Sequence, residues 1–145
     1  MFAEMRTSKP DGVPRTEVAF YEESEAAPVV VWLESLPRKA QAKCQAYLWQ
    51  LEQFGHELKR PIAAYLRDGI YELRPSYQGV HYRLLYFFAS PRPGSAGEEA
   101  SIVVVSHGLV KERTVPDSEV DRAIGRKRRF EAHPERHTFS PARRR

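Results

Sequence analysis

Residues 70–88 read IYELRPSYQGVHYRLLYFF, and the pattern of this stretch sets the architecture expected for the whole chain. Two segments rich in aromatic and aliphatic residues flank the connection 76–79, which is typical of a β-hairpin. We count the pairing back from the turn, with Pro75 opposite Val80. The expected cross-strand pairs are then Arg74 with His81 and Glu72 with Arg83.

Cross-strand partners point to the same side of a sheet, so this hairpin has two different faces. One face carries the charged and polar side chains Glu72, Arg74, His81 and Arg83. The other carries the apolar or aromatic side chains Tyr71, Leu73, Tyr82 and Leu84. The second face can join a core, which leaves two arginines and a histidine free to meet an anion. We therefore expect a phosphate-containing ligand, and hence nucleic acid.

The chain of 145 residues is long enough for one domain with a single core and too short for two. Hydrophobic residues make up 41% and charged residues 29%, the composition of a soluble globular protein. No apolar run approaches the roughly 18 residues of a membrane span, and the first residues lack the apolar core of a secretory signal. We therefore expect a cytoplasmic protein with no membrane partner. The single cysteine, Cys44, falls on the apolar face of a helical pattern and is predicted to be a core residue.

The positive charge gathers at the C-terminal end. Residues 126–145 contain eight Lys or Arg and two Asp or Glu, whereas the net charge of the whole chain is only +4. The other 125 residues therefore carry a net charge of −2. Overall basicity is thus a weak argument for a polyanion partner, and the placement of charge within the fold matters more.

The rest of the chain supplies helices before the hairpin, then a strand and a helix after it. We expect a strand at 16–21, helices at 29–34 and 37–54, the two hairpin strands, an exposed loop at 90–97, a fourth strand at 101–106 that ends at His107-Gly108, and a closing helix from Pro116 to about Glu131. Residues 1–15 are expected to be a disordered leader and 132–145 a disordered basic tail, with one domain at 16–131. This order predicts an α+β fold in which two N-terminal helices and a C-terminal helix cover one face of a mostly antiparallel four-stranded sheet.

Cleavage of RNA without a metal needs three kinds of group. The ribose 2′-hydroxyl must lose a proton and attack the adjacent phosphorus, charge on the phosphoryl oxygens must be stabilised, and the departing 5′-oxygen must gain a proton. His, Arg and Lys suit these tasks. The candidates are Arg74 and Arg83 from the hairpin, His107 from the end of the next strand, and Lys111 with Arg113 just after it.

Each candidate also has a purely structural interpretation. Glu72 and Arg83 can form an ordinary cross-strand ion pair, His107 can close a turn, and Lys111 can be a solvated loop charge. The functional interpretation depends on several of these residues sharing one surface. The sequence contains no paired Cys/His spacing for zinc, no glycine-rich phosphate loop and no serine nucleophile elbow, so neither a metal nor a cofactor is expected.

Several of these segments, taken together and in this order, resemble the RelE/ParE superfamily of bacterial toxins, in the HigB-like branch often labelled phage-derived. The resemblance covers about 18–130. It rests on VWLESLP at 31–37, GIYELR at 69–74, YRLLYF at 82–87, HGLVK at 107–111, and Pro116 leading into RKRRF at 126–130.

The resemblance implies a RelE-like domain that acts as the toxin of a type II toxin–antitoxin system. A helix-turn-helix antitoxin from the same operon would hold it inactive, and it would meet DNA only through that antitoxin. It would cleave messenger RNA in the ribosomal A site by the metal-free chemistry set out above. Carried over position by position, the resemblance suggests Arg74 and Arg83 for phosphate charge, His107 as base or acid, and Lys111 for phosphate contact or proton donation. Further expected contacts to RNA are His81, Arg113, Arg126, Lys127, Arg128 and Arg129.

Two other functions fit the same sequence. A ParE-like toxin would bind DNA gyrase and cut nothing, and such a toxin needs no proton-transfer group. An inactive domain could also be retained only for DNA-bound regulation together with its antitoxin. The presence of both His107 and Lys111 favours the nuclease.

Overall fold

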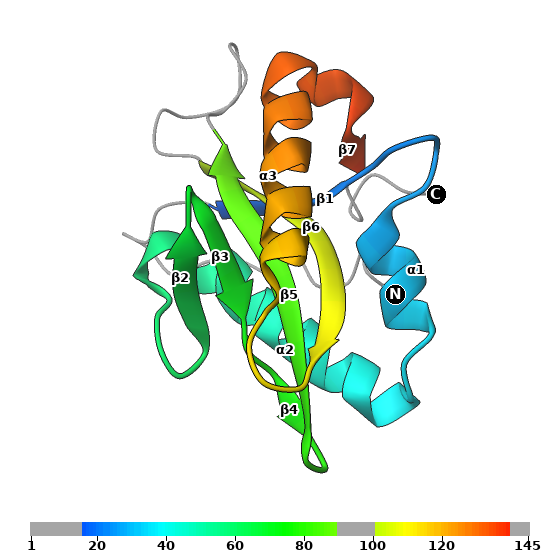
Figure 1. Cartoon of the computed structure of the whole chain (residues 1–145), viewed down its shortest axis with the longest axis vertical. Coiled ribbons are helices and arrows are strands. Elements are labelled where there is room, and N and C mark those ends of the chain that lie inside the picture. The colour runs from blue at the N-terminus through cyan, green and yellow to red at the C-terminus, as the bar shows by residue number, and fades with distance from the viewer. Residues whose placement is uncertain (1–15, 90–100, 140–145) are drawn as a thin grey trace.

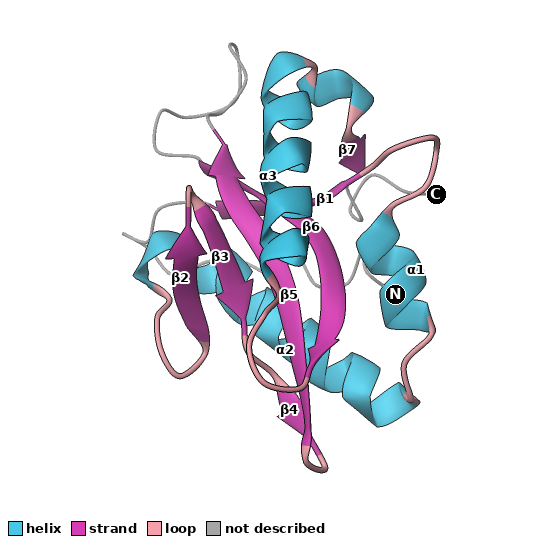
Figure 2. Cartoon of the chain, viewed as in Figure 1, coloured by secondary structure: helices cyan, strands magenta, loops and turns pink. Residues whose placement is uncertain are grey.

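The computed structural model describes residues 16–89 and 101–139. Within these residues it contains one seven-stranded sheet and three α-helices (Figures 1 and 2). The strands are β1 (Thr16–Tyr21), β2 (Ala63–Arg67), β3 (Ile70–Leu73), β4 (Ser76–Tyr77), β5 (Val80–Ala89), β6 (Ser101–Lys111) and β7 (Thr138–Phe139). The helices are α1 (Pro28–Glu34), α2 (Arg38–Phe54) and α3 (Asp117–Ala132), with short 3-10 helices at η2 (Gly55–Glu57) and η3 (Pro134–Arg136). The mixed α+β class predicted from the sequence is confirmed.

The strands lie in the order β2-β3-β5-β6-β1-β7, with β4 paired to one end of β5. Neighbours run antiparallel except β1 and β6, which are parallel. The prediction of a four-stranded sheet is wrong. Among the described residues, β2 lies where the sequence predicts only a connection, β4 occupies part of the expected turn, and β7 falls in the expected tail.

The hairpin turn is tighter than the sequence suggested. The pairs nearest the turn are Ser76 with His81 and Tyr77 with Val80, so pairing continues past Pro75. Only Gln78 and Gly79 remain to turn the chain, with φ of 50° and 79°. Two successive residues with positive φ are the signature of a type I′ turn, whose twist matches that of the flanking strands.

The tighter turn shifts the register by two residues. Glu72 lies opposite Leu85, and not opposite Arg83 as predicted. Because side chains alternate along a strand with a period of two, a shift of two leaves every side chain on its predicted face. The expected division into a charged face and an apolar face therefore survives the error in register.

Helices cover both faces of the sheet, which corrects the expectation of a single covered face. In Figure 1, α3 lies in front of the sheet and α2 lies behind it. The core on the α1 and α2 side contains Val29, Leu33, Cys44, Leu48, Leu51, Leu73, Leu84 and Tyr86. The core under α3 contains Ile70, Leu85, Phe87, Val104, Val120, Ala123 and Phe130. Successive residues of β5 thus enter different cores, as expected for a central strand buried on both sides.

The two N-terminal helices form where the sequence predicts them. Pro28 opens α1, and α2 buries a stripe at three- and four-residue spacing that includes the fully buried Cys44. Burial raises the pKa of the Cys44 thiol to about 12, so this side chain is an inert core residue. Gly55 ends α2 with a φ of 50°, and a Cβ there would lie 2.6 Å from the Thr16 hydroxyl oxygen.

Strand β6 continues to Lys111, whereas the sequence predicts that it ends at His107-Gly108. Gly108 lies within this extension, and the indole of Trp32 in α1 lies directly against its Cα, with no room for a Cβ. Trp32 also makes an edge-to-face contact with Tyr82, with ring centroids 6.0 Å apart. The missing side chain at position 108 thus lets α1 pack closely on the end of β6.

Gly108→Ala is expected to destabilise the protein by about 1–3 kcal/mol, the usual cost of overpacking a filled site. The added methyl group overlaps the Trp32 ring, which has to shift away from β6. Urea denaturation of the variant and parent measures the loss. The same substitution in a Trp32→Leu background is expected to cost clearly less, and an equal cost in both backgrounds would contradict this explanation.

After α3 the described chain continues through η3 and β7 to Phe139, within the segment expected from the sequence to be a disordered tail. The backbone N–H of Glu22 donates to the carbonyl of His137 at 2.9 Å, and Nδ1 of the His137 ring lies 2.9 Å from the carbonyl oxygen of Glu22. The His137 ring also stacks on Tyr21, with ring centroids 5.0 Å apart. Strand β7 then pairs with the end of β1. The predicted leader at 1–15, the loop at 90–97 and the rest of the tail at 140–145 lie outside the described residues. None of the helices in the described part of the chain is both long and apolar enough to span a membrane.

Candidate functional site

The pairing of β5 with β6 brings three of the four predicted catalytic residues, Arg83, His107 and Lys111, to one face of the sheet. His81 pairs with Lys111, Arg83 with Leu109, and Leu85 with His107. Paired residues share a face, and residues two apart on one strand share it too, so all of these side chains point to the α3 side. Arg74 and Glu72 on the neighbouring β3 segment join the same side. The end of this face at the β4–β5 hairpin projects beyond α3 (Figure 1).

Two arginines contact one carboxylate at this end of the sheet, and two further cations lie within range of their charges. The Nη1 of Arg74 lies 2.6 Å from Oε2 of Glu72, and the Nε of Arg83 lies 3.4 Å from its Oε1. Lys111 and Arg60 are close enough for their charges to interact with Arg83. We call Arg60, Arg74, Arg83 and Lys111 the cation cluster.

The pKa values of two cluster members reflect this crowding. Partial burial lowers the pKa of Lys111, and the neighbouring charges of Arg83 and Arg74 lower it further. Burial also lowers the pKa of Arg83, and the attraction of Glu72 offsets only part of that effect. One carboxylate therefore does not neutralise the cluster, which keeps an excess of positive charge suited to an anion.

His107 lies on the same face, diagonal to Arg83, but under the first turn of α3 and only 6% exposed. Its Nε2 is 2.9 Å from Oε1 of Glu119, and its Nδ1 is 2.7 Å from Oγ of Ser106. Burial lowers the pKa of His107 to about 4, against the partly opposing effect of Glu119. The ring is therefore neutral at pH 7: Nε2–H donates to Glu119, Nδ1 accepts from the Ser106 hydroxyl, and no ring nitrogen remains open to a substrate.

The depressed pKa of His107 predicts a loss of stability in acid. Above pH 6.5, the usual histidine pKa, the ring is neutral in both folded and unfolded chains and has no effect on pH dependence. As the pH falls from about 6.5 toward about 4, only the unfolded chain takes up the proton, so the free energy of unfolding decreases. Urea denaturation at pH 7.5, 6.0 and 4.5 should show this decrease.

A His107→Gln variant provides the control for that experiment, because it cannot take up the proton. Its unfolding free energy should fall less than that of the parent over the same pH range. The charged groups around the ring are Glu119, Arg122 and Arg126, and their contributions are common to both proteins. Parallel pH profiles for parent and variant would contradict the assignment.

Most of the basic residues predicted to bind RNA on α3 have partners within the protein. Lys127 pairs with Glu131 at 2.9 Å. Arg129 donates from Nε to the Tyr21 hydroxyl at 3.0 Å, and Arg126 lies over the Tyr21 ring, 5.4 Å from its centroid. The contacts of Arg126 and Arg129 hold α3 against β1, although parts of these side chains reach solvent.

The other predicted RNA contacts are exposed. Arg128 lies on the outer side of α3, and Arg113 lies in the segment between β6 and α3. His81 is exposed beside the turn, with Nδ1 2.7 Å from the hydroxyl of Ser76. His81 pairs with Lys111, so it borders the cation cluster, while Arg128 lies on another element.

Sequence reasoning missed Arg60, which precedes β2 and contributes positive charge to the cluster. The signal for it was the short apolar run 62–64 after Pro61, which forms the start of a strand paired with β3. Because the sequence predicts only a connection at this point, it assigns Arg60 to no element and to no face of the sheet. Sequence reasoning also treated Glu72 as the partner of Arg83 alone, whereas it contacts both arginines.

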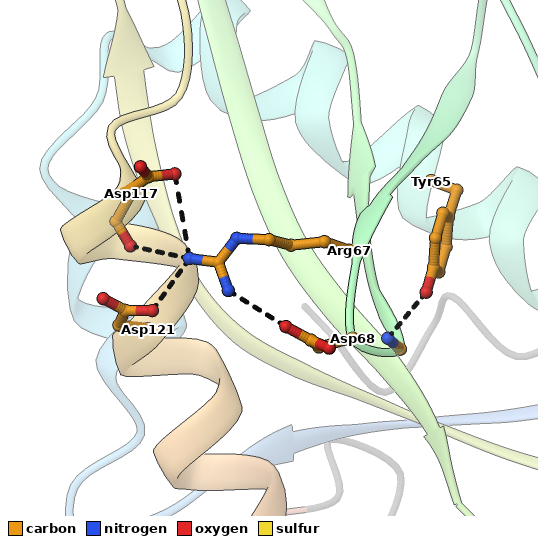
Figure 3. A network of polar contacts seen from close by, with 6 residues as sticks. Tyr65, Arg67, Asp68, Asp117 and Asp121 are labelled. Atoms are coloured by element: carbon orange, nitrogen blue, oxygen red, sulfur yellow. Dashed lines mark hydrogen bonds and ion pairs between the residues drawn. The ribbon is translucent and has the colours of Figure 1, made fainter.

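A second ionic network fixes the start of α3 against the β2–β3 hairpin (Figure 3). Arg67 in β2 contacts Asp121 at 2.8 Å, Asp117 at 3.7 Å and Asp68 at 3.1 Å. The same turn is closed by the backbone N–H of Gly69, which donates to the Tyr65 hydroxyl at 3.0 Å. These contacts and the bond between His107 and Glu119 hold both sides of the first turn of α3, and thereby the segment 112–116 that follows Lys111.

No group of three or more His, Cys, Asp or Glu side chains suited to a metal ion occurs among the described residues. The arrangement itself offers cations, a lysine with a lowered pKa, and hydrogen bonds. These groups can bind a phosphodiester and stabilise additional charge on it.

The fold and this face define a class, a small α+β protein with a cluster of cations at one end of its sheet. A family model described as Phage derived protein Gp49-like (DUF891) matches residues 31–128. The chain belongs to this family, which is of the RelE-like toxin type. The match includes the cation cluster and His107, and it does not distinguish a HigB-like branch. No curated protein matches the chain.

Proposed function

We propose that the protein is the toxin of a type II toxin–antitoxin system and that it cleaves messenger RNA on the ribosome. The observation that carries this proposal is the cation cluster, in which groups from four separate segments meet at one end of the sheet. Such a cluster suits the phosphodiester of RNA, whose charge increases when the 2′-oxygen attacks. The family match supports the toxin type and leaves the activity as our proposal.

The chemistry requires no cofactor. The 2′-oxygen forms a bond to phosphorus as its proton passes to water, and the bond from phosphorus to the 5′-oxygen breaks. Arg74, whose side chain is partly exposed, contacts the phosphoryl oxygens, and the buried Arg83 beside it adds positive charge that stabilises them without direct contact. Lys111 gives a proton to the departing 5′-oxygen. The products are a 2′,3′-cyclic phosphate and a 5′-hydroxyl. The lowered pKa of Lys111 makes it a better proton donor than an ordinary lysine.

We assign His107 a different role from the one that the resemblance suggests. Both of its ring nitrogens are bonded within the protein, to Ser106 and Glu119, and the ring is buried. A proton-transfer group must be able to reach the substrate, and Lys111 is better placed for that task. We propose that His107 holds β6 to α3.

The partners follow from the same proposal. We infer a cytoplasmic protein neutralised by a helix-turn-helix antitoxin, which alone contacts DNA, with the ribosome and messenger RNA as targets. These inferences depend on the toxin type of the family. Inspection of the neighbouring open reading frames for a small DNA-binding protein tests the antitoxin directly.

Inducing the protein in a bacterium and mapping transcript 5′ ends by primer extension tests the activity. New cuts at fixed positions within codons are expected soon after induction, with 5′-hydroxyl ends. Cuts that are equally frequent in untranslated RNA would contradict dependence on the ribosome.

The alternative is a ParE-like inhibitor of DNA gyrase. One observation favours it: His107, whose presence supported a nuclease, is buried and fully bonded. Plasmid supercoiling measured in the same induced cells distinguishes the two. Loss of negative supercoiling without RNA cuts would establish the alternative.

A further inference from the structure

Glu72 occupies a position that its contribution to the fold does not explain. Its side chain is 4% exposed, and on its face of the sheet its neighbours across β2 and β5 are Ala64 and Leu85. A carboxylate buried beside such residues is unfavourable unless it is well paired. Its partners are Arg74 and Arg83, both on the same face.

The two contacts differ in quality. Arg74 donates from Nη1 to Oε2 at 2.6 Å, a short charge-assisted hydrogen bond. Arg83 lies 3.4 Å away through its Nε, and this buried Nε and the Oε1 of Glu72 have no hydrogen-bond partner among the described residues. The second pair therefore has electrostatic attraction without the geometry that usually stabilises a buried pair.

Two guanidinium groups placed side by side repel each other. A carboxylate between them removes this repulsion and also limits the rotation of two long side chains. Arg83 is further held by its Nη1, which donates to the carbonyl of Tyr82 at 2.8 Å. Glu72 can thus hold the guanidinium groups of Arg74 and Arg83 at one fixed distance from each other, while Lys111 and Arg60 remain beside them.

We propose that Glu72 is the positioning residue of the site, the group that holds Arg74 and Arg83 at the spacing needed to stabilise a phosphodiester during cleavage. It does not act as the base, because its Oε1 is buried and out of reach of a ribose. This inference rests on the proposed function and adds a residue that acts through the two arginines.

Glu72→Gln gives the test, because glutamine keeps the shape and loses the charge. The cluster then gains one net positive charge, so RNA binding should stay equal or become tighter, with a salt dependence steeper by about 0.7 in the log–log slope for a single strand. Cutting should nevertheless slow at least 10-fold, because the two arginines separate. Anisotropy of a labelled single-stranded RNA at several salt concentrations measures binding, and single-turnover cleavage on programmed ribosomes measures cutting.

Opposite changes in binding and cutting are the signature of positioning. A merely structural role would change neither, or would reduce both together, and either result overturns the proposal. Asp68→Asn, in the turn between β2 and β3, is the matched control, because it also removes one carboxylate from an arginine, Arg67. That variant should change binding and cutting less than about 2-fold. Both variants are compared well below their unfolding temperatures.

A third measurement separates this inference from the proposed function. The Nε–H signal of Arg83 in an ¹⁵N spectrum of the full chain should be sharp in the parent and should shift and broaden in Glu72→Gln. An unchanged signal overturns the positioning role even if the parent cuts RNA. If the parent cuts no RNA, the proposed function fails. A broadened Arg83 signal in Glu72→Gln would still show that Glu72 restricts the motion of the Arg83 side chain.

Discussion

Replacing Lys111 by alanine is expected to slow RNA cutting about 100-fold or more, the range seen when a general acid is removed. Lys111 lies at the end of β6, and its lowered pKa comes from partial burial and from Arg83 and Arg74. Its side chain is not part of either core, so the free energy of unfolding should change by less than about 0.5 kcal/mol. Single-turnover cleavage on programmed ribosomes and urea denaturation measure the two quantities.

Two further variants show whether the charge or the proton of Lys111 matters. Lys111→Arg keeps the positive charge, but a guanidinium does not release its proton near neutral pH. RNA binding should stay within about 2-fold of the parent while cutting remains at least about 10-fold slower. Lys43→Ala, on the exposed side of α2 behind the sheet, should leave both unchanged. Full cutting by Lys111→Arg would mean that Lys111 contributes only its charge.

The secondary structure could be predicted where a local pattern is strong. The stripe of α2, the proline that opens α1 and the alternation in β5 each identify an element and its buried side. Strand β2 has only five residues, and Pro61 just before it indicated a loop, so the sequence did not predict this strand. Strand β7 has two residues and depends on contacts with β1 that no local pattern contains.

The charged face could be predicted because the period of a strand is two. The register of the hairpin was wrong by two residues, and that error moved the partner of Glu72 without moving Arg83 to the other face. The turn itself was misjudged because Pro75 suggested that pairing stops there. In the structure Tyr82 donates its N–H to the carbonyl of Pro75 at 2.8 Å, so the proline stays within the paired region.

The state of His107 could not be predicted from the sequence. A histidine at the end of a strand can be open to substrate or closed by a neighbour, and the result depends on where α3 packs. Here Glu119, twelve residues later, comes to 2.9 Å from the ring because α3 covers this part of the face. The same packing places Arg126 and Arg129 on Tyr21, which left fewer free basic residues than the sequence suggested.

Replacing Arg83 by methionine is expected to abolish cutting and also to destabilise the protein by about 3–5 kcal/mol, because Glu72 stays buried with one partner fewer. The side chain of Arg83 is 3% exposed, so water cannot take its place as the partner of Glu72 without a change in packing. Guanidinium chloride denaturation measures the stability. A loss of this size makes the single variant ambiguous as a test of function, since a poorly folded toxin also fails to cut.

The double variant Glu72→Leu, Arg83→Met removes this ambiguity. Buried ion pairs can often be replaced by apolar residues of similar size at little cost, and the pair here lacks a hydrogen bond at Arg83 Nε, so the double variant should recover stability to within about 1–2 kcal/mol of the parent. Arg74 loses its carboxylate but is 21% exposed and can turn toward water. A double variant that is folded, has its stability within that range of the parent and is unable to cut would show that the buried pair serves the site more than the fold. If its loss of stability instead equals the sum of the two single variants, the two side chains are not coupled, and packing alone would explain why Arg83 is buried.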